Sequence, residues 1–341
     1  MVETTPVSII IPAYNAATTI RATLKSVAAQ TLQPAEVVVV DDGSTDDTLA
    51  IATACKDFLA PDTLVVVHQE NAGAGAARNR AIAEASQEYL AFIDADDEWL
   101  PEKLSRSMDV MLGGDFTLVA HDFYQINDDG DVQIKCARRF NEADDPFVAL
   151  YQKGFIPSIT VVIRRADALA VGGFDDSLRN AQDFELWLAL LSRPGATFTI
   201  FNEPLARYSN NPVGIMSFTD RRLRCVTEIA VRYLPTLQGR ASFPIGAMWL
   251  RLIAVHKEAF DAHRSNGRIV RAAGVGVKFA LSMIRETITA AFIKPGLTPR
   301  QNALNEIKIT AAVWIWAAGC IALFMLQFQA IMPAILGAVG L

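Results

Sequence analysis

Four short apolar segments lie between residues 7 and 93, and the stretches that separate them have the length and pattern of helices. The apolar segments cover residues 7–11, 37–40, 64–68 and 89–93. Buried parallel strands have continuous apolar sequences, and strands that alternate with helices at this spacing form a sheet with right-handed crossovers. The pattern predicts an α/β fold with a doubly wound, Rossmann-like sheet flanked by helices.

The fourth apolar segment runs directly into a group of carboxylates. Asp94, Asp96 and Asp97 follow residues 89–93, which places them at the carboxyl end of a strand, where ligands bind in open α/β sheets. Such close carboxylates repel one another unless water or a cation neutralises them. Carboxylate oxygens suit Mg²⁺ or Mn²⁺ held jointly with phosphate. A loop that caps the next helix explains the same residues without a ligand.

Three further polar segments follow strands of the same predicted sheet. Tyr14, in the loop 12–15, is suited to stacking on a flat ring, and Asp42 is suited to accept hydrogen bonds from a base or ribose. The glycine-rich segment 71–75 leads to Arg78, and a helix that begins with glycines attracts phosphate. Each segment also has a purely structural explanation. Their coincidence at one edge of the sheet favours a ligand site.

Shorter elements are expected around and after these segments. Helices are predicted after Thr18 or Thr19 as far as residue 30, and after Ser44 or Thr45 as far as residue 58. Strands are predicted over 116–125, 132–137, 157–163 and 197–202, with helices over 145–151 and 181–192. From residue 221 onward the pattern is helical.

The motifs together resemble those of family 2 glycosyltransferases with the GT-A fold. The segments that carry the resemblance are 8–15, 40–46, 71–79, 93–97 and 172–175, within a region from about residue 7 to residue 208. The resemblance implies a nucleotide-sugar donor, a divalent cation and transfer with inversion, and UDP is the nucleotide that the family uses most. Pro12, Tyr14 and Asp42 match positions that hold the base, Asp94 matches a donor contact, and Asp96 matches the principal metal ligand. The candidate donor site also includes Asn15, Asn71, Gly73, Arg78 and Ala95.

The resemblance also points to a catalytic base. An inverting transfer is a single displacement, so one group must take the proton from the acceptor hydroxyl. Asp183 matches the position of that base, just before a helix rich in aromatic residues and leucine. Gln182 replaces the glutamate usual in the family, and Glu185 is the next candidate. The four histidines lie outside the matched motifs and are expected to be structural or surface residues.

Charge is distributed unevenly along the chain. The 341 residues carry a net charge of −6, yet residues 264–308 contain eight lysines and arginines and only two glutamates. This distribution argues against nucleic acid and favours a local anionic surface as partner. Four scattered cysteines without metal or redox spacing indicate a reducing compartment, and the short stretch before the first strand lacks the apolar core of a signal peptide.

The C-terminal part has the features of a membrane attachment. Arg271, Lys278 and Arg285 recur every seventh residue of an amphipathic segment over 267–293. This segment is expected either to lie among lipid headgroups or to pack on the catalytic domain. Residues 309–341 carry no charge and exceed the roughly 20 residues that a membrane-spanning helix needs. Basic residues before them predict a cytoplasmic flank, although an apolar oligomerisation helix would have the same composition.

The resulting prediction has three parts: a GT-A catalytic domain over 1–220, divided into a nucleotide-sugar half (1–115) and an acceptor half (116–220); a basic helical region over 221–308; and a transmembrane helix over 309–341. The expected protein is a glycosyltransferase of the plasma membrane with a cytoplasmic catalytic domain. It would act on a lipid or lipid-linked glycan in cell-envelope or exopolysaccharide synthesis. The alternatives are an inactive nucleotide-sugar-binding scaffold and a dehydrogenase. A dehydrogenase would need Gly-x-Gly-x-x-Gly after the first strand, where residues 12–15 read Pro-Ala-Tyr-Asn.

Overall fold

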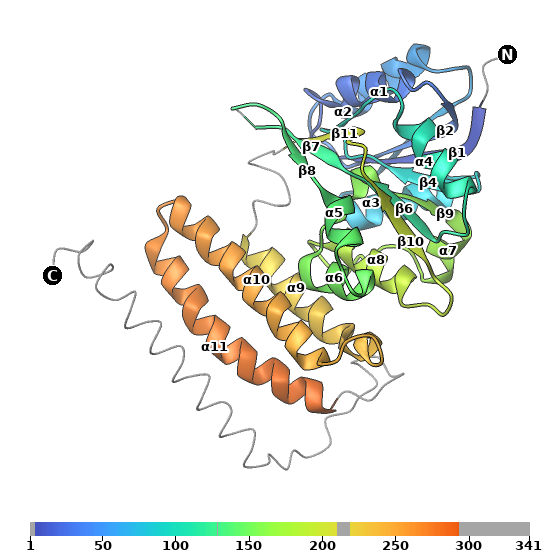
Figure 1. Cartoon of the computed structure of the whole chain (residues 1–341). Coiled ribbons are helices and arrows are strands. Elements are labelled where there is room, and N and C mark those ends of the chain that lie inside the picture. The colour runs from blue at the N-terminus through green and yellow to red at the C-terminus, as the bar shows by residue number, and fades with distance from the viewer. Residues whose placement is uncertain (1–3, 128, 210–218, 293–341) are drawn as a thin grey trace. The chain divides into compact units, whose positions relative to one another are not determined.

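The computed structural model describes residues 4–127, 129–209 and 219–292. The chain divides into two compact units, residues 1–225 and 226–341. The first unit contains both sheets, and the second contains helices in its described part (Figure 1).

A seven-stranded mixed sheet forms the centre of the first unit, with strand order β10-β6-β9-β4-β1-β2-β3. All of its strands run parallel except β9, which is antiparallel to both of its neighbours, β4 and β6. The central segments of β1, β2 and β4, over residues 9–11, 37–40 and 90–92, are apolar and fully buried, as burial on both faces requires. The strands of this sheet are β1 (Thr4–Ala13), β2 (Gln33–Asp42), β3 (Leu64–Gln69), β4 (Tyr89–Phe92), β6 (Leu118–His121), β9 (Val162–Arg164) and β10 (Phe198–Phe201).

Helices connect the parallel strands, as the sequence predicts. The steps from β1 to β2 and from β2 to β3 go in one direction along the sheet, and the step from β3 to β4 goes back. Right-handed crossovers therefore put α1 and α2 on one face and α3 on the other. In agreement, α1 contacts α2, whereas α3 packs on β1 and β2 (Figure 1). These helices are α1 (Ile20–Ala28), α2 (Thr48–Ala54) with a 3₁₀ turn over Cys55–Phe58, and α3 (Ala74–Glu84).

A second, four-stranded sheet extends the first unit, with strand order β5-β11-β7-β8. Its strands are β5 (Glu98–Trp99), β7 (Phe123–Gln125), β8 (Val132–Ile134) and β11 (Ala206–Tyr208). The remaining helices of the first unit are α4 (Lys103–Leu112), α5 (Cys136–Asn141), α6 (Pro146–Lys153), α7 (Arg165–Ala170) and α8 (Gln182–Leu191), with a 3₁₀ turn over Ser158–Thr160.

Several expected boundaries are wrong. The strand expected to stop at Pro12 continues to Ala13, because β4 pairs only as far as Ile10 and leaves the proline without a neighbour on that side. The helix expected after Ser44 or Thr45 starts at Thr48 instead, with Asp47 at its N-cap. The strand expected over 116–125 is broken at Asp122 into β6 and β7. The expected strand 157–163 is a 3₁₀ turn followed by β9.

The described part of the second unit is a hairpin of two long helices, preceded by the end of another helix and a 3₁₀ turn. Helix α9 (Thr219–Arg232) crosses the boundary between the units, and a 3₁₀ turn over Leu234–Leu237 precedes α10 (Pro244–Ser265) and α11 (Ile269–Phe292). Helices α10 and α11 pack on each other. Within the described residues no helix is long and apolar enough to cross a membrane. The segment expected to do so, 309–341, lies outside the described residues.

Candidate active site

Loops at the carboxyl ends of β1 and β2 are bonded to each other through Asn15. Its side-chain Oδ1 accepts a hydrogen bond from the Thr45 backbone amide at 2.9 Å, and the backbone amide of Asn15 donates to Ser44 Oγ at 2.9 Å. Asn15 has a positive φ of 48°, a conformation that asparagine tolerates better than most residues. The neighbouring Tyr14 is 53% exposed, so its ring is available to a ligand rather than buried in the loop.

Asp42 organises the glycine-rich loop that precedes α3. Its carboxylate accepts hydrogen bonds from the amides of Ala72 and Gly73, at 2.9 and 2.8 Å, and from Gln69 Nε2 at 2.7 Å. The Asn71 side chain donates to the Asp42 carbonyl at 2.9 Å. Asp42 is buried and both of its carboxylate oxygens are engaged, so it fixes the loop, and a contact with a base would add to these bonds or replace them.

The start of α3 lies against the start of α8. Gly73 has a φ of +98°, and a Cβ atom at Gly75 would lie 2.7 Å from Nε2 of Gln182. The Arg179 guanidinium donates to the Ala72 carbonyl at 2.9 Å. A side chain at position 75 would displace the Gln182 carboxamide, and this close packing brings the region of Asp183 to the predicted donor loop.

Arg78 is committed to the protein rather than open to a phosphate. It is 7% exposed, and its Nη2 lies 2.6 Å from Asp94 Oδ1. Its guanidinium carbon lies 5.3 Å from the ring centroid of Phe174, a cation–π distance. The expected phosphate contact is not what this conformation presents, and the ion pair instead orients Asp94 at the end of β4.

The carboxylates after β4 lie in different environments. Asp97 is 1% exposed, and its Oδ1 accepts a hydrogen bond from the Ser209 amide at 2.7 Å. Among the described residues its Oδ2 has no hydrogen-bond partner. Burial and then the charge of Asp94 raise the pKa of Asp97 well above its usual range. Asp94 and Asp96 are partly exposed, and Ala95 between them is buried.

The cluster of carboxylates after β4 suits a cation that is held partly by the protein and partly by the phosphates of a bound donor. No set of three or more acidic, histidine or cysteine side chains in the described chain is arranged to enclose a metal ion. Magnesium, however, is commonly held by one or two carboxylates together with substrate phosphates. A partly exposed Asp96 and the unpartnered buried oxygen of Asp97 match that pattern.

Asp183 lies in the first turn of α8. Its Oδ1 accepts a hydrogen bond from the Phe184 amide at 2.8 Å, and Ala181 before it is left-handed, with φ 57°. Burial raises the pKa of Asp183, and the positive charge of Arg78 opposes that shift. Asp183 remains partly exposed, whereas the other candidate, Glu185, is only 6% exposed. The geometry therefore favours Asp183 over Glu185 as the residue that meets a substrate.

Aromatic packing holds α8 against the end of β4. The rings of Phe92, Phe174 and Trp187 contact one another edge to face, with centroids 5.7 to 6.5 Å apart. The Trp187 indole also donates to the Ile156 carbonyl at 3.1 Å. This cluster fixes the base candidate relative to Asp94.

Two positioning residues were not predicted. Arg179 and Ser209 reach the loop and the carboxylates through contacts between residues far apart in sequence, and no local pattern signals such contacts. Of the four histidines, His68 is exposed and bonds Asp41 at 2.7 Å, whereas the others are buried, namely His121, His256 and His263. The fold and this site define an α/β protein with several carboxylates gathered at the carboxyl edge of its main sheet.

Comparisons with known proteins identify the class. The model of the glycosyl transferase family 2 matches residues 8–169. The amylovoran biosynthesis glycosyltransferase AmsB of Erwinia amylovora is 30% identical over 59% of this chain and 68% of that protein. The putative teichuronic acid biosynthesis glycosyltransferase TuaG of Bacillus subtilis is 33% identical over 59% of this chain and 78% of that protein. The chain belongs to the family 2 glycosyltransferases.

Other matches differ in how much they cover. An uncharacterized glycosyltransferase of Nostoc sp. is 42% identical, but the chain spans only 35% of its length. The S. aureus TarS 1–349 structure in complex with UDP-GlcNAc superimposes with a TM-score of 0.60 at 20% identity, over 87% of each chain. The mannosyltransferase PcManGT from Pyrobaculum calidifontis, in complex with GDP-Man and Mn²⁺, has a TM-score of 0.54 at 18% identity, over 96% of this chain and 86% of that one. At these identities the likeness establishes the GT-A-like fold.

Proposed function

We propose that the chain transfers a sugar, with inversion, from a nucleotide-diphosphate sugar to a hydroxyl of a membrane lipid or lipid-linked glycan. UDP is the favoured nucleotide, and cell-envelope or exopolysaccharide synthesis is the favoured context. The observation that carries the proposal is the accessible Asp183 beside the Arg78–Asp94 ion pair. The names of AmsB and TuaG, and the UDP-GlcNAc bound to TarS, support the donor and the context.

The chemistry needs one proton acceptor and one neutralised leaving group. Asp183 takes the proton from the acceptor hydroxyl while that oxygen attacks the anomeric carbon. The bond between the anomeric carbon and the phosphate oxygen breaks, and the nucleoside diphosphate leaves with the electron pair. The raised pKa of Asp183 makes it a stronger base than an ordinary aspartate.

Several residues prepare the donor side. The exposed ring of Tyr14 stacks on the base, and Asp42, through its bonds to the amides of Ala72 and Gly73, fixes the glycine-rich loop on the donor side. Asp96, with Asp97 beside it, would hold Mg²⁺ or Mn²⁺, which when bound offsets charge on the departing diphosphate. Mn²⁺ in the PcManGT complex supports this expectation.

Replacing Asp183 by Asn tests the proposed function. The variant keeps the shape of the side chain and removes its basicity, so transfer should fall by about 10² to 10⁴ while donor affinity is nearly retained. Glu185→Gln is the matched control. Loss of transfer in the control alone would move the base to Glu185. Donor binding by the wild type without any transfer or donor hydrolysis would identify a scaffold instead.

The outward surface of α11 supports the membrane part of the proposal. Ala272, Val275 and Met283 are buried on the side that faces α10. Helical geometry of 100° per residue puts the outer face of α11, which consists of Val270, Val277 and Leu281, on the opposite side. These three residues are 87%, 59% and 64% exposed.

Charge next to this outer face favours a bilayer as its partner. Arg271, Lys278 and Arg285 are exposed and form a row along one border of the outer face. An apolar face bordered by cations suits the boundary between headgroups and acyl chains of an anionic membrane. We therefore include a cytoplasmic-side membrane attachment through α11, with the predicted span over 309–341 as the anchor.

A further inference from the structure

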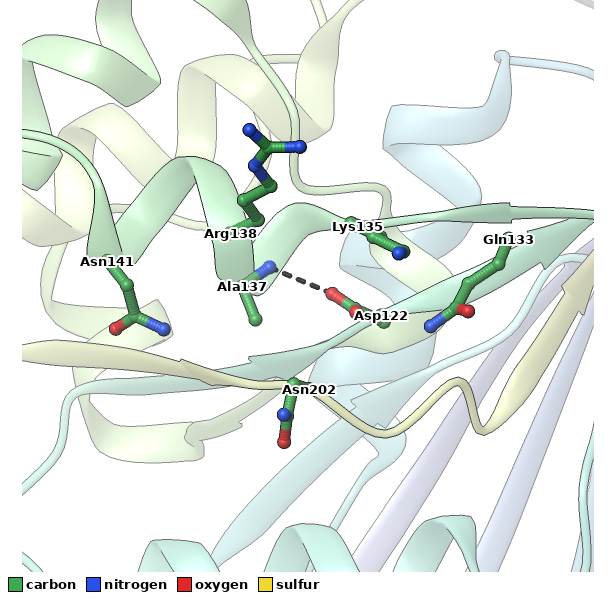
Figure 2. A pocket seen from close by; sticks show the side chains of 7 residues that line it. All are labelled: Asp122, Gln133, Lys135, Ala137, Arg138, Asn141 and Asn202. Atoms are coloured by element: carbon green, nitrogen blue, oxygen red, sulfur yellow. Dashed lines mark hydrogen bonds between the residues drawn. The ribbon is translucent and has the colours of Figure 1, made fainter.

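A cavity of about 300 Å³ lies in the first unit, away from the carboxylates after β4. All but one of its lining residues have polar or charged side chains, and none is aromatic (Figure 2). The lining consists of Asp122, Gln133, Lys135, Ala137, Arg138, Asn141 and Asn202. The volume is at the lower end of the range for ligand pockets, so the cavity suits a small ligand.

The topology puts this cavity on the same edge of the sheet as the candidate active site. Asp122 directly follows β6 and Asn202 directly follows β10, and both strands run parallel to β4. Only β9 separates β4 from β6. Neighbouring strands are about 4.8 Å apart, so β6 and β10 end roughly 10 to 15 Å along the edge from β4.

Asp122 forms a fixed base for the cavity. It is 2% exposed, and its Oδ1 accepts a hydrogen bond from the Ala137 amide at 2.8 Å. Its backbone is bonded to Phe201 and Leu205, which ties the break between β6 and β7 to the end of β10. The carboxylate therefore keeps its position without a ligand.

The side chains around Asp122 differ in orientation and in whether they are already ion-paired. In Figure 2 the Gln133 carboxamide and the Lys135 side chain lie on the same side as the Asp122 carboxylate, whereas Arg138 extends away from it. Arg138 forms an ion pair with Glu142 at 2.8 Å. Lys135 has no ion pair among the residues with a defined position. The cavity thus combines one acidic acceptor, one cationic donor and amides that can do both.

This combination selects among the possible acceptors. An acyl or prenyl chain would lie among polar and charged side chains at every lining position except Ala137, and an isolated phosphate would meet the negative charge of Asp122. Adjacent hydroxyl groups both donate and accept, so they can use the carboxylate, the ammonium and the amides together. A sugar ring carries such hydroxyls.

We infer that the cavity is an acceptor subsite that binds a sugar unit one or two residues removed from the reacting hydroxyl. The inference rests on the proposed function and narrows it, because the acceptor is then a glycan that already carries sugars, not a bare lipid. Asp122 and Gln133 bind the hydroxyls of that unit, and Lys135 donates to one of them.

Ligand-observed saturation-transfer NMR on the full chain in detergent tests the inference without requiring turnover. The probes are cellobiose, lactose, maltose, chitobiose and a glucuronate-containing disaccharide, and binding of inorganic phosphate, which has no carbon-bound protons, is followed by ³¹P line broadening. The double variant Gln133→Ala/Asn202→Ala removes two exposed amides of the lining. Asn127→Ala, an exposed amide between β7 and β8 outside the lining, is the matched control.

At least one disaccharide should bind, and the double variant should weaken it about tenfold, as expected for the loss of two neutral hydrogen bonds. The control should bind normally. Absence of sugar binding, an equal effect in both variants, or phosphate binding that Lys135→Met removes, without sugar binding, would each overturn the inference. A thermal shift by UDP with Mn²⁺ is measured in parallel, so a failure of the donor site is distinguished from a failure of this subsite.

Discussion

At the scale of single residues, the charged side chains of the site lie close enough to affect one another's orientation and pKa. Arg78 pairs with Asp94 at 2.6 Å, and its charge also lowers the pKa of Asp183, which burial raises. Asp97 is buried beside Asp94 with one oxygen unpartnered in the described structure. The arrangement holds a surplus of negative charge that a divalent cation would offset.

Asp96→Ala should abolish metal-dependent donor binding and leave the fold intact. The reason is that a hard cation needs carboxylate oxygen, and Asp96 is the partly exposed carboxylate matched to that role. Isothermal titration of UDP with and without Mn²⁺ measures the effect, and Asp109→Ala, an exposed aspartate on α4, is the control. Transfer that persists in the presence of a chelator would refute the metal assignment.

Lys103→Met should make the protein more stable near neutral pH and change how stability depends on pH. Lys103 is fully buried, its Nζ lies 4.0 Å from the Trp99 ring centroid, and burial lowers its pKa to about 7. An unfolded lysine has a pKa of about 10.4, so between these values the unfolded chain binds more protons. The free energy of unfolding should rise with pH in this window, by at most about 1.4 kcal/mol per pH unit, and the gain is lost as pH falls toward 7.

Urea unfolding at pH 7, 8 and 9 measures this dependence. In the Lys103→Met variant the free energy of unfolding should rise less steeply with pH than in the wild type. In the control Lys56→Met, which replaces an exposed lysine, it should rise as steeply as in the wild type. Identical slopes for wild type and Lys103→Met would mean that Lys103 is charged in the folded protein.

At the scale of elements, the alternation of strands and helices was predictable, and the breaks within elements were not. Residues 89–93 are apolar enough to indicate a buried strand without other information. Asp122 interrupts a strand because its carboxylate caps the Ala137 amide from another element, and that is a tertiary contact. Ser44 was expected to cap a helix but instead bonds Asn15, since the loop after β1 competes for the same hydroxyl.

Predictability of the site followed the same division. Residues such as Tyr14, Asp96 and Asp183 were nominated from local motifs and from the family resemblance that those motifs carry, and their roles stay predictions. Arg78 was found, but its partner was not, because the sequence does not reveal that the guanidinium turns toward Asp94. The polar cavity at Asp122 has no local signature, since its lining comes jointly from β8, α5 and the residues that directly follow β6 and β10.

The outer face of α11 should enter the headgroup region of anionic vesicles. An environment-sensitive fluorophore at Val277→Cys, in a Cys320→Ser background, should shift to the blue on anionic vesicles, less on neutral ones, and less at high salt. Lys257→Cys, at an exposed position of α10, is the control. Replacing Arg271, Lys278 and Arg285 by Gln should weaken the free energy of binding to anionic vesicles by about 1 kcal/mol per charge removed. Shielding of position 277 without lipid would indicate that protein covers this face.

At the scale of the whole molecule, two attachments of different strength are expected. The 33 uncharged residues 309–341 suit an anchor, and α11 suits a reversible surface contact. Truncation after Lys308 should leave a folded enzyme that binds donor but leaves membranes in high salt. Full-length protein should remain in the membrane pellet after carbonate extraction, and its release by carbonate would refute the span.

The position of β9 has a consequence for how the chain is made. β9 lies between β4 and β6 but follows β4 by roughly 70 residues. At about 5 to 20 residues per second, the ribosome takes roughly 4 to 14 s to cover that stretch. Until then the apolar edge of β4 has no partner on that side, and an open edge invites pairing with other nascent chains. We therefore expect the demand for chaperones during synthesis to depend on when Val162–Arg164 becomes available to pair.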